Sequence, residues 1–266
     1  MSNPKESPRC RRRFQRAQVR GDIGLEDEAG VRDLARLYDI SHQGLCVHTQ
    51  KPMPKDKIYR AAFLPGAEEA PIVLKGRVAW NSQEQDVFGA TRVLNGIEFM
   101  DLPLDREKII RKFIDQRTSA IYTALGLVQE ITEFSDEEQR IVATACVDRT
   151  LKSGQNMEME ESTGAIIMIR SGSVHYRETS SVGETLTARS IAQGQICGYP
   201  PIDPRGLPIT HIVALQEGAV TYLPPDAFHR IQKDSPTTVV KLLSALCISL
   251  LERLRLVKAS KLNLNV

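Results

Sequence analysis

The sequence predicts a mainly β protein with helices, organised as two β-rich domains joined by a helix. Its 266 residues, at about 150 residues per domain, correspond to roughly two domains. Short β-branched or alternating runs occupy residues 31–99 and 154–223, and a helical pattern separates them. With 41% hydrophobic and 26% charged residues, the composition is that of a folded globular chain.

The first domain is predicted at residues 1–103, beginning with a polar, flexible arm that contains Pro4 and Pro8. Turn signals at Lys51-Pro52, Pro65-Gly66 and Asn81-Ser82 separate its strand-like runs. That spacing favours a small β-barrel or sandwich. The expected strands are residues 45–48, 57–63, 72–80 and 96–99.

Two helices are expected next. A linker helix is predicted over residues 104–127, with the acidic first turn Asp105-Arg106-Glu107. A second helix, over residues 135–150, should begin with a capping box in which Ser135 faces Glu138. In the linker helix, apolar residues recur at intervals of three and four: Ile109, Ile110, Phe113, Ile114, Ile121 and Leu125.

The second domain is predicted at residues 128–266, with turn glycines between strand-like runs such as 165–169. A long helix is expected over residues 237–256. One interpretation buries its whole apolar face within the domain, and the other pairs one face with a second copy of the chain to form a homodimer. The residues that repeat at coiled-coil spacing are Val240, Leu243, Cys247, Leu250, Leu254 and Val257.

Two short patterns in the first domain supply the chemistry of an anionic-nucleotide site. Arg12 and Arg16 lie four residues apart, and guanidinium groups bind phosphate or the O6 and N7 edge of guanine. Asp39, Ser41 and Gly44 follow at a strand entrance. A carboxylate accepts from the guanine N1 and N2 donors, a hydroxyl donates or accepts, and glycine permits close backbone approach.

These motifs resemble those of the PilZ family, the bacterial cyclic di-GMP receptors. The family patterns Arg-x-x-x-Arg and Asp/Asn-x-Ser-x-x-Gly match Arg12 with Arg16 and Asp39 with Ser41 and Gly44. The resemblance continues through residues 76–80 and 96–99 and implies a six-stranded barrel whose N-terminal arm closes over cyclic di-GMP. Arg11 and Arg13 are possible additional ligand-binding residues, although the motif does not require them.

The second half resembles the cyclic-nucleotide-binding jelly roll of catabolite-activator-type regulators. The strand segment 169–174 and the glycines before the phosphate-binding cassette carry this resemblance. The cassette departs from the family pattern, because Tyr199 stands after Gly198 where glutamate is expected, and Arg205 comes several residues too early. Without the glutamate and the arginine of the family pattern, the ligand loses charged hydrogen bonds that are each worth about 1.5–3 kcal/mol. We therefore expect weak binding of cAMP and cGMP.

Several function classes are disfavoured. A net charge of +2 predicts no global polyanion-binding surface, and five scattered cysteines indicate reduced thiols in a cytoplasmic protein. The histidines and cysteines lack zinc-ligand spacing, so we expect no metal, and no apolar run is long enough for a membrane span. No nucleophile with a base partner is evident, and we interpret Glu158-Met159-Glu160-Glu161 as the solvated face of a strand. A non-enzyme without cofactor is predicted.

The expected function is therefore that of a cyclic di-GMP effector. The ligand would order the N-terminal arginine arm on the barrel and change the interaction with an unidentified protein partner or with the second domain. Three alternatives remain open: a cyclic-mononucleotide receptor, an integrator of both ligands, and a regulator that binds nucleic acid through the basic arm.

Overall fold

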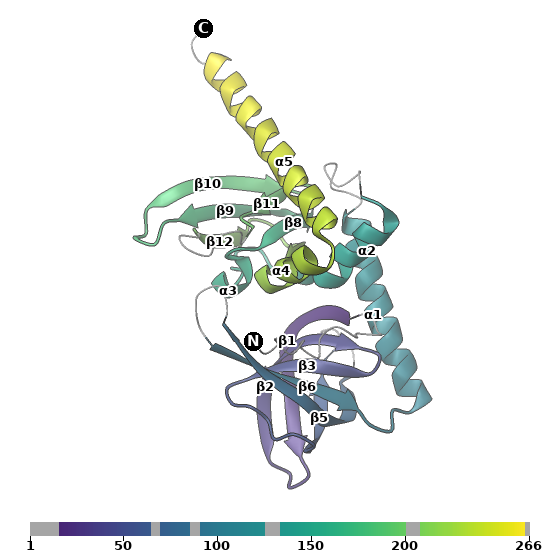
Figure 1. Cartoon of the computed structure of the whole chain (residues 1–266). Helices are drawn as coiled ribbons and strands as arrows, with labels where there is room; N and C mark the ends of the chain where they lie inside the picture. Colours follow the sequence, from purple (N-terminus) through teal and green to yellow (C-terminus); the bar gives the residue numbers. More distant parts are fainter. Residues whose placement is uncertain (1–15, 65–69, 86–90, 126–133, 201–207, 264–266) are drawn as a thin grey trace, which may run out of the picture. The chain divides into compact units, whose positions relative to one another are not determined.

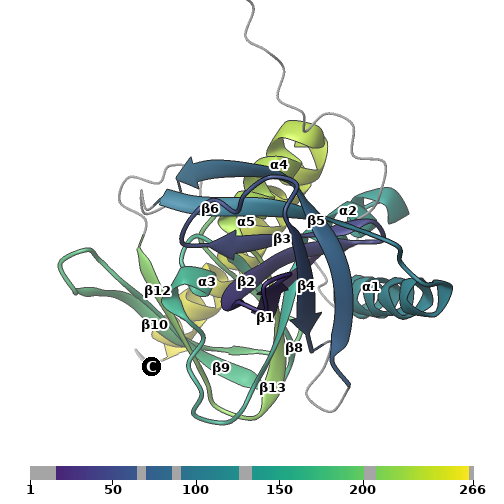
Figure 2. The ribbon, with the colours of Figure 1, turned by 90° about the horizontal axis from the view of Figure 1, so that it is seen from below.

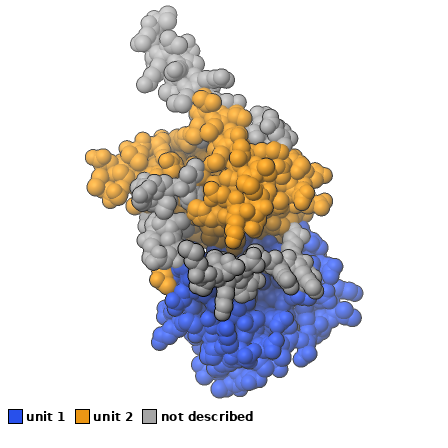
Figure 3. All heavy atoms as spheres, in the orientation of Figure 1, with its two compact units in different colours: residues 1–84, 92–116 blue, residues 85–91, 117–266 orange. Residues whose placement is uncertain are grey.

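The computed structural model describes residues 16–64, 70–85, 91–125, 134–200 and 208–263 (Figure 1). Two compact units make up the chain, residues 1–84 with 92–116 and residues 85–91 with 117–266 (Figure 3). Within the described ranges, no helix is long and apolar enough to cross a membrane.

The first unit is a closed six-stranded barrel in the order β1-β2-β3-β6-β5-β4 (Figure 2). The four predicted strands are confirmed within β3 to β6, and two further strands, β1 and β2, precede them. Apolar side chains such as Ile23, Leu37 and Ile97 alternate into its interior and are fully buried. The strands are β1 Arg16–Asp27, β2 Arg32–Ser41, β3 Gly44–Thr49, β4 Ile58–Phe63, β5 Ile72–Gln85 and β6 Thr91–Phe99.

Helix α1, Leu104–Leu125, confirms the predicted linker helix. The apolar residues of this helix pack in two different hydrophobic cores. Ile110 and Ile114, near its start, are buried in the hydrophobic cluster of the barrel. Ile121 and Leu125, near its end, are buried in a cluster of the second unit. The helix is therefore a structural part of both units.

Helix α2, Asp136–Ala145, opens the second unit with the predicted capping box. The Ser135 hydroxyl accepts from the Glu138 amide, and the Glu138 carboxylate accepts from the Ser135 amide. The prediction that this helix continues to residue 150 is wrong. Cys146 adopts extended backbone angles, and the following residues pair with β13, a partner more than sixty residues away along the chain.

The second unit contains two antiparallel sheets, one of three strands in the order β10-β9-β12 and one of four in the order β11-β8-β13-β7. Their facing side chains form a shared hydrophobic cluster that includes Val174, Tyr176 and Ile212. The mainly β class with a β-rich second half is thereby confirmed. The strands are β7 Val147–Leu151, β8 Ile166–Ser171, β9 Ser173–Thr179, β10 Thr185–Ala192, β11 Ile196–Gly198, β12 Ile209–Ala214 and β13 Gly218–Leu223.

The acidic segment before β8 differs from its prediction. Instead of forming a solvated strand face, it contains the single helical turn α3, Met159–Ser162. Glu161 is buried and forms an ion pair with Arg149 of β7. Because Met157 is buried and the amide of Glu161 bonds the carbonyl of Glu158, the chain turns here instead of extending.

Two helices close the unit, α4 Pro225–Asp234 and α5 Pro236–Asn263, which confirms the predicted long C-terminal helix. Val239, Leu242 and Leu246 of α5 are buried in the core of the unit. The predicted coiled-coil stripe lies mostly outside this buried face of the helix. Val240 is 63% exposed and Leu250 is 46% exposed, and Cys247 is also exposed. Leu243 packs partly against the core, and the side chains of Leu254 and Val257 lie outside the described residues.

Candidate functional site

The β2–β3 hairpin carries the second sequence motif. Ser41 and Gly44 are cross-strand partners, so His42 and Gln43 form a two-residue turn. The Ser41 hydroxyl donates to the Gly44 carbonyl at 3.1 Å and accepts from the Gln43 amide at 3.4 Å. This buried serine therefore fixes the shape of the turn at the edge of the site.

Gly44 lies where no side chain fits. A Cβ atom at this position would come within 2.5 Å of the Ile97 carbonyl oxygen on the neighbouring strand β6. The close approach of β3 to β6 therefore requires glycine at this position.

Arg16 and Asp39 form the charged centre of the site. Arg16 begins β1 and pairs with Ser41 across the ladder, which brings its side chain to the second motif. The Arg16 Nη1 atom lies 2.6 Å from Asp39 Oδ1, in a charge-assisted hydrogen bond. The Asp39 side chain is only 4% exposed, whereas that of Arg16 is 24% exposed. The carboxylate therefore holds the guanidinium in one orientation while part of it still faces solvent.

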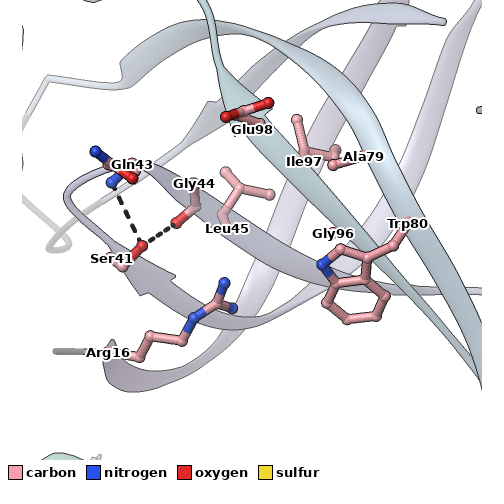
Figure 4. A pocket seen from close by; sticks show the side chains of 10 residues that line it. All are labelled: Arg16, Ser41, Gln43, Gly44, Leu45, Ala79, Trp80, Gly96, Ile97 and Glu98. Carbon is pink, nitrogen blue, oxygen red and sulfur yellow. Dashed lines mark hydrogen bonds between the residues drawn. The ribbon is translucent and has the colours of Figure 1, made fainter. Parts of the chain in front are cut away.

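A cavity of about 220 Å³ opens beside this pair. The Arg16 side chain reaches into the space between the Ser41 turn and the indole ring of Trp80 (Figure 4). Glu98, at another edge, forms an ion pair with Arg77 at 3.2 Å. The lining residues are Arg16, Ser41, Gln43, Gly44, Leu45, Ala79, Trp80, Gly96, Ile97 and Glu98.

Trp80 forms an aromatic wall of this cavity. Its indole packs on the bare backbone of Gly96, where a Cβ atom would come well under 3.0 Å from the ring nitrogen. The cavity thus combines a flat aromatic surface with a guanidinium and apolar side chains. Aromatic faces stack on nucleobases, and guanidinium groups bind phosphates or the guanine edge. This arrangement suits a nucleotide.

The structure brings together Arg16, Asp39, Ser41 and Gly44, four of the residues that the sequence motifs single out. Arg11, Arg12 and Arg13 lie outside the described residues. Sequence reasoning missed Trp80 and Gly96 as lining residues. The signal available was that Trp80 is the single tryptophan of the chain and ends a predicted strand.

The predicted cassette of the second unit is described in part. Gly198 ends β11 with a φ of +108°, and a Cβ atom there would overlap the Ala165 carbonyl oxygen. Tyr199 is 48% exposed, and Arg205 lies outside the described residues. Among the residues that the structure describes, no three histidine, cysteine or acidic side chains are grouped to hold a metal ion.

Comparison with known proteins gives a family for the first unit. The model of the PilZ domain family matches residues 11–116. Comparison with curated protein sequences gives no match.

Similar solved structures fall into two groups. A cyclic nucleotide-binding domain from Methylobacillus flagellatus KT is 20% identical, with 53% of this chain and 80% of that chain covered and a TM-score of 0.41. The PilZ domain of YcgR from Escherichia coli with c-di-GMP is 15% identical, with 41% and 97% covered and a TM-score of 0.36. The MrkH–c-di-GMP complex of K. pneumonia is 21% identical, with 40% and 51% covered and a TM-score of 0.35.

The family match includes both sequence motifs, all six strands of the barrel and all the residues that line the cavity. Residues 11–116 of this chain are a PilZ domain.

Proposed function

We propose that this protein is a receptor for cyclic di-GMP, which binds in the Arg16–Trp80 cavity of the PilZ domain. The observation that carries the proposal is the Arg16–Asp39 ion pair beside the indole of Trp80, within a region that matches the PilZ family. The protein acts as an effector and not as an enzyme.

Four residues in or beside the cavity have roles in this proposal. The exposed part of the Arg16 guanidinium binds a phosphate or the O6 and N7 edge of guanine. Asp39 holds Arg16 in place and accepts from the guanine N1 and N2 donors. Trp80 stacks on one base, and the backbone at Gly44 allows the ligand to approach the hairpin closely.

The N-terminal arm completes the site through Arg12, four residues before Arg16, with charge support from Arg11 and Arg13. Ligand binding orders the arm on the barrel and thereby changes the surface that is offered to a protein partner or to the second domain. The second domain does not bind cAMP or cGMP strongly, because Tyr199 supplies no carboxylate after Gly198.

A titration with cyclic di-GMP tests this site directly. Because Trp80 is the only tryptophan and lines the cavity, its fluorescence should change on binding, and calorimetry gives the affinity independently. In Arg12→Ala plus Arg16→Ala, each lost bidentate contact should cost about 1–3 kcal/mol. Arg60→Ala, which removes an exposed arginine of β4 outside the cavity, is the matched control.

Binding of cyclic di-GMP alone, weakened in the double variant and retained in Arg60→Ala, would support the proposal. Equal affinity in the double variant and the wild type would refute the site. A parallel titration with cAMP and cGMP should give little heat, and strong binding of either would favour the cyclic-mononucleotide alternative.

The exposed stripe of α5 supports a homodimer. Val240, Cys247 and Leu250 are exposed at coiled-coil spacing while the neighbouring stripe is buried in the core. We expect sedimentation to give the mass of two chains for the wild type and of one chain for Val240→Glu plus Leu250→Glu. Lys233→Glu, on α4, is the control, and a wild type that sediments as one chain would refute the dimer.

A further inference from the structure

The inner face of the β10-β9-β12 sheet changes from apolar to polar along its strands. In one cross-strand row, Val174 lies between Ile191 and Ala214, and all three are buried. The next inward-facing row joins Arg189, Tyr176 and Ile212, and the row after it joins Thr187, Glu178 and Thr210. The arginine of β10 therefore lies on the same face of the sheet as the buried ring of Tyr176.

Arg189 has no anionic partner among the residues that the structure describes. Its recorded contact is with the ring of Tyr176, whose centroid lies 5.2 Å from the guanidinium carbon. The Nε atom of Arg189 is buried and has no hydrogen-bond acceptor within the described residues. A buried donor without an acceptor destabilises a protein, and a guanidinium without a counter-charge does so more strongly.

The acidic side chain in the neighbouring row of this face already has a hydrogen-bond donor. Glu178, diagonally across from Arg189, accepts a hydrogen bond from the hydroxyl of Tyr176. Tyr176 is fully buried, and burial raises the pKa of its hydroxyl, which therefore stays protonated and remains a donor. Tyr176 thus holds the Glu178 carboxylate while its ring supports the guanidinium of Arg189.

Side chains around this group are fixed by the neighbouring strands. The Thr210 amide donates to the Thr163 hydroxyl at 3.1 Å, and the Ser162 hydroxyl donates to the Thr210 carbonyl at 2.6 Å. Thr210 is fully buried, whereas Arg189 and Glu178 are half-buried. The guanidinium is therefore both held in place and within reach of a ligand.

We propose that the second unit holds a small-anion site in which Arg189 binds a phosphate or carboxylate group against the ring of Tyr176. The planar guanidinium pairs with either oxyanion through two parallel hydrogen bonds. The Glu178 carboxylate, on the same face, can accept from a hydroxyl of the ligand. The site uses residues of β9 and β10 and none of the cassette residues Gly198, Tyr199 or Arg205.

The test measures anion binding to the full chain by calorimetry, with inorganic phosphate, acetate and cAMP as separate probes. Arg189→Gln removes the charge but keeps a polar side chain. Arg177→Gln is the matched control, because Arg177 lies on β9 but points to the opposite face of the sheet, where it is exposed. Thermal unfolding of both variants, compared with that of the wild type, checks that the second unit of each remains folded.

We expect at least one probe to bind the wild type and Arg177→Gln, and to bind Arg189→Gln about tenfold or more weakly, as the loss of a charged hydrogen bond predicts. Binding of both phosphate and acetate would show that free oxyanions fill the site, and weak binding of cAMP alone, reduced in Arg189→Gln, would assign the site to a phosphodiester. Absence of binding by all three probes, or equal binding to Arg189→Gln, would overturn the proposal. Neither result bears on cyclic di-GMP binding to the PilZ domain.

Discussion

Replacing Gly96 by alanine should disable the aromatic wall of the PilZ cavity without touching a charged residue. The added Cβ atom would come well under 3.0 Å from three atoms of the Trp80 indole, including its nitrogen. Ordinary carbon contacts begin at about 3.5 Å, so the indole has to move or rotate away from the backbone of β6. The substitution therefore changes the position of Trp80 and leaves Arg16 and Asp39 in place.

The expected cost has two parts. A displaced indole loses its stacking on a base, which is worth about 1–3 kcal/mol and corresponds to a loss of roughly five- to 150-fold in affinity. Overpacking of the strand contact should lower the free energy of unfolding of the barrel by about 1–3 kcal/mol. The barrel should nevertheless fold, because Trp80 is half-buried and can turn toward solvent.

Calorimetric titration with cyclic di-GMP, together with the emission spectrum of Trp80, measures both effects. Gly24→Ala is the matched control, since a Cβ atom at this position in β1 meets its nearest neighbour, the Ala62 carbonyl oxygen, only at 3.8 Å. Unchanged affinity and an unchanged Trp80 spectrum in Gly96→Ala would refute the assignment of Trp80 as a wall of the binding site.

Three further predictions concern the second unit. Glu161→Gln removes the buried ionic partner of Arg149, and chemical denaturation should show that the free energy of unfolding falls by about 3 kcal/mol. This value is at the low end for buried ion pairs because the Arg149 side chain is 27% exposed, and an unchanged denaturation midpoint would contradict the prediction. Gly198→Ala places a side chain on a residue with a φ of +108° and against the Ala165 carbonyl oxygen. Thermal unfolding should therefore show that the free energy of unfolding falls by about 3 kcal/mol or more. A decrease below 1 kcal/mol, on the order of an ordinary glycine substitution, would argue against this backbone conformation. The hydrogen bond from Lys241 holds the pKa of Glu138 below its ordinary value. The ionised Glu138 therefore stabilises the fold above its unfolded pKa of about 4.3, and this stabilisation is lost as the pH falls through the folded pKa. The difference in unfolding free energy between the wild type and Glu138→Gln should shrink on acidification, and a constant difference would exclude this linkage.

Local patterns predicted the elements that depend on local interactions. The capping box at Ser135 and Glu138 is a contact within one helical turn, and the apolar stripe of α1 has helical periodicity. By contrast, β1 was missed because charged residues and two glycines interrupt its apolar alternation. Barrel closure stabilises this strand by pairing it with both β2 and β4, which no local pattern reveals.

The errors in the second unit have a similar origin. Residues 141–147 are largely apolar and fit either a helix or a strand, and pairing with β13 decides in favour of β7. The alternation around Met157 suggested a strand, but the Arg149–Glu161 ion pair joins segments twelve residues apart and accompanies a helical turn.

The sequence predicted the part of the site that comes from two short motifs on strands adjacent in the chain. Arg16 meets Asp39 because β1 and β2 are neighbours in the chain and in the barrel. Trp80 reaches Gly96 only through the packing of two later strands, so its place in the cavity follows from tertiary structure alone.

The shared helix α1 has a practical consequence for any attempt to study the halves separately. A cut between residues 116 and 117, where the compact units divide, would leave Ile110 and Ile114 with the barrel and Ile121 and Leu125 with the second unit, but it would break α1 into two pieces too short to be stable helices by themselves. Independent fragments would each need their own copy of the helix. A chimera that exchanges one unit for another domain would have to keep α1 at its full length, because both cores depend on it.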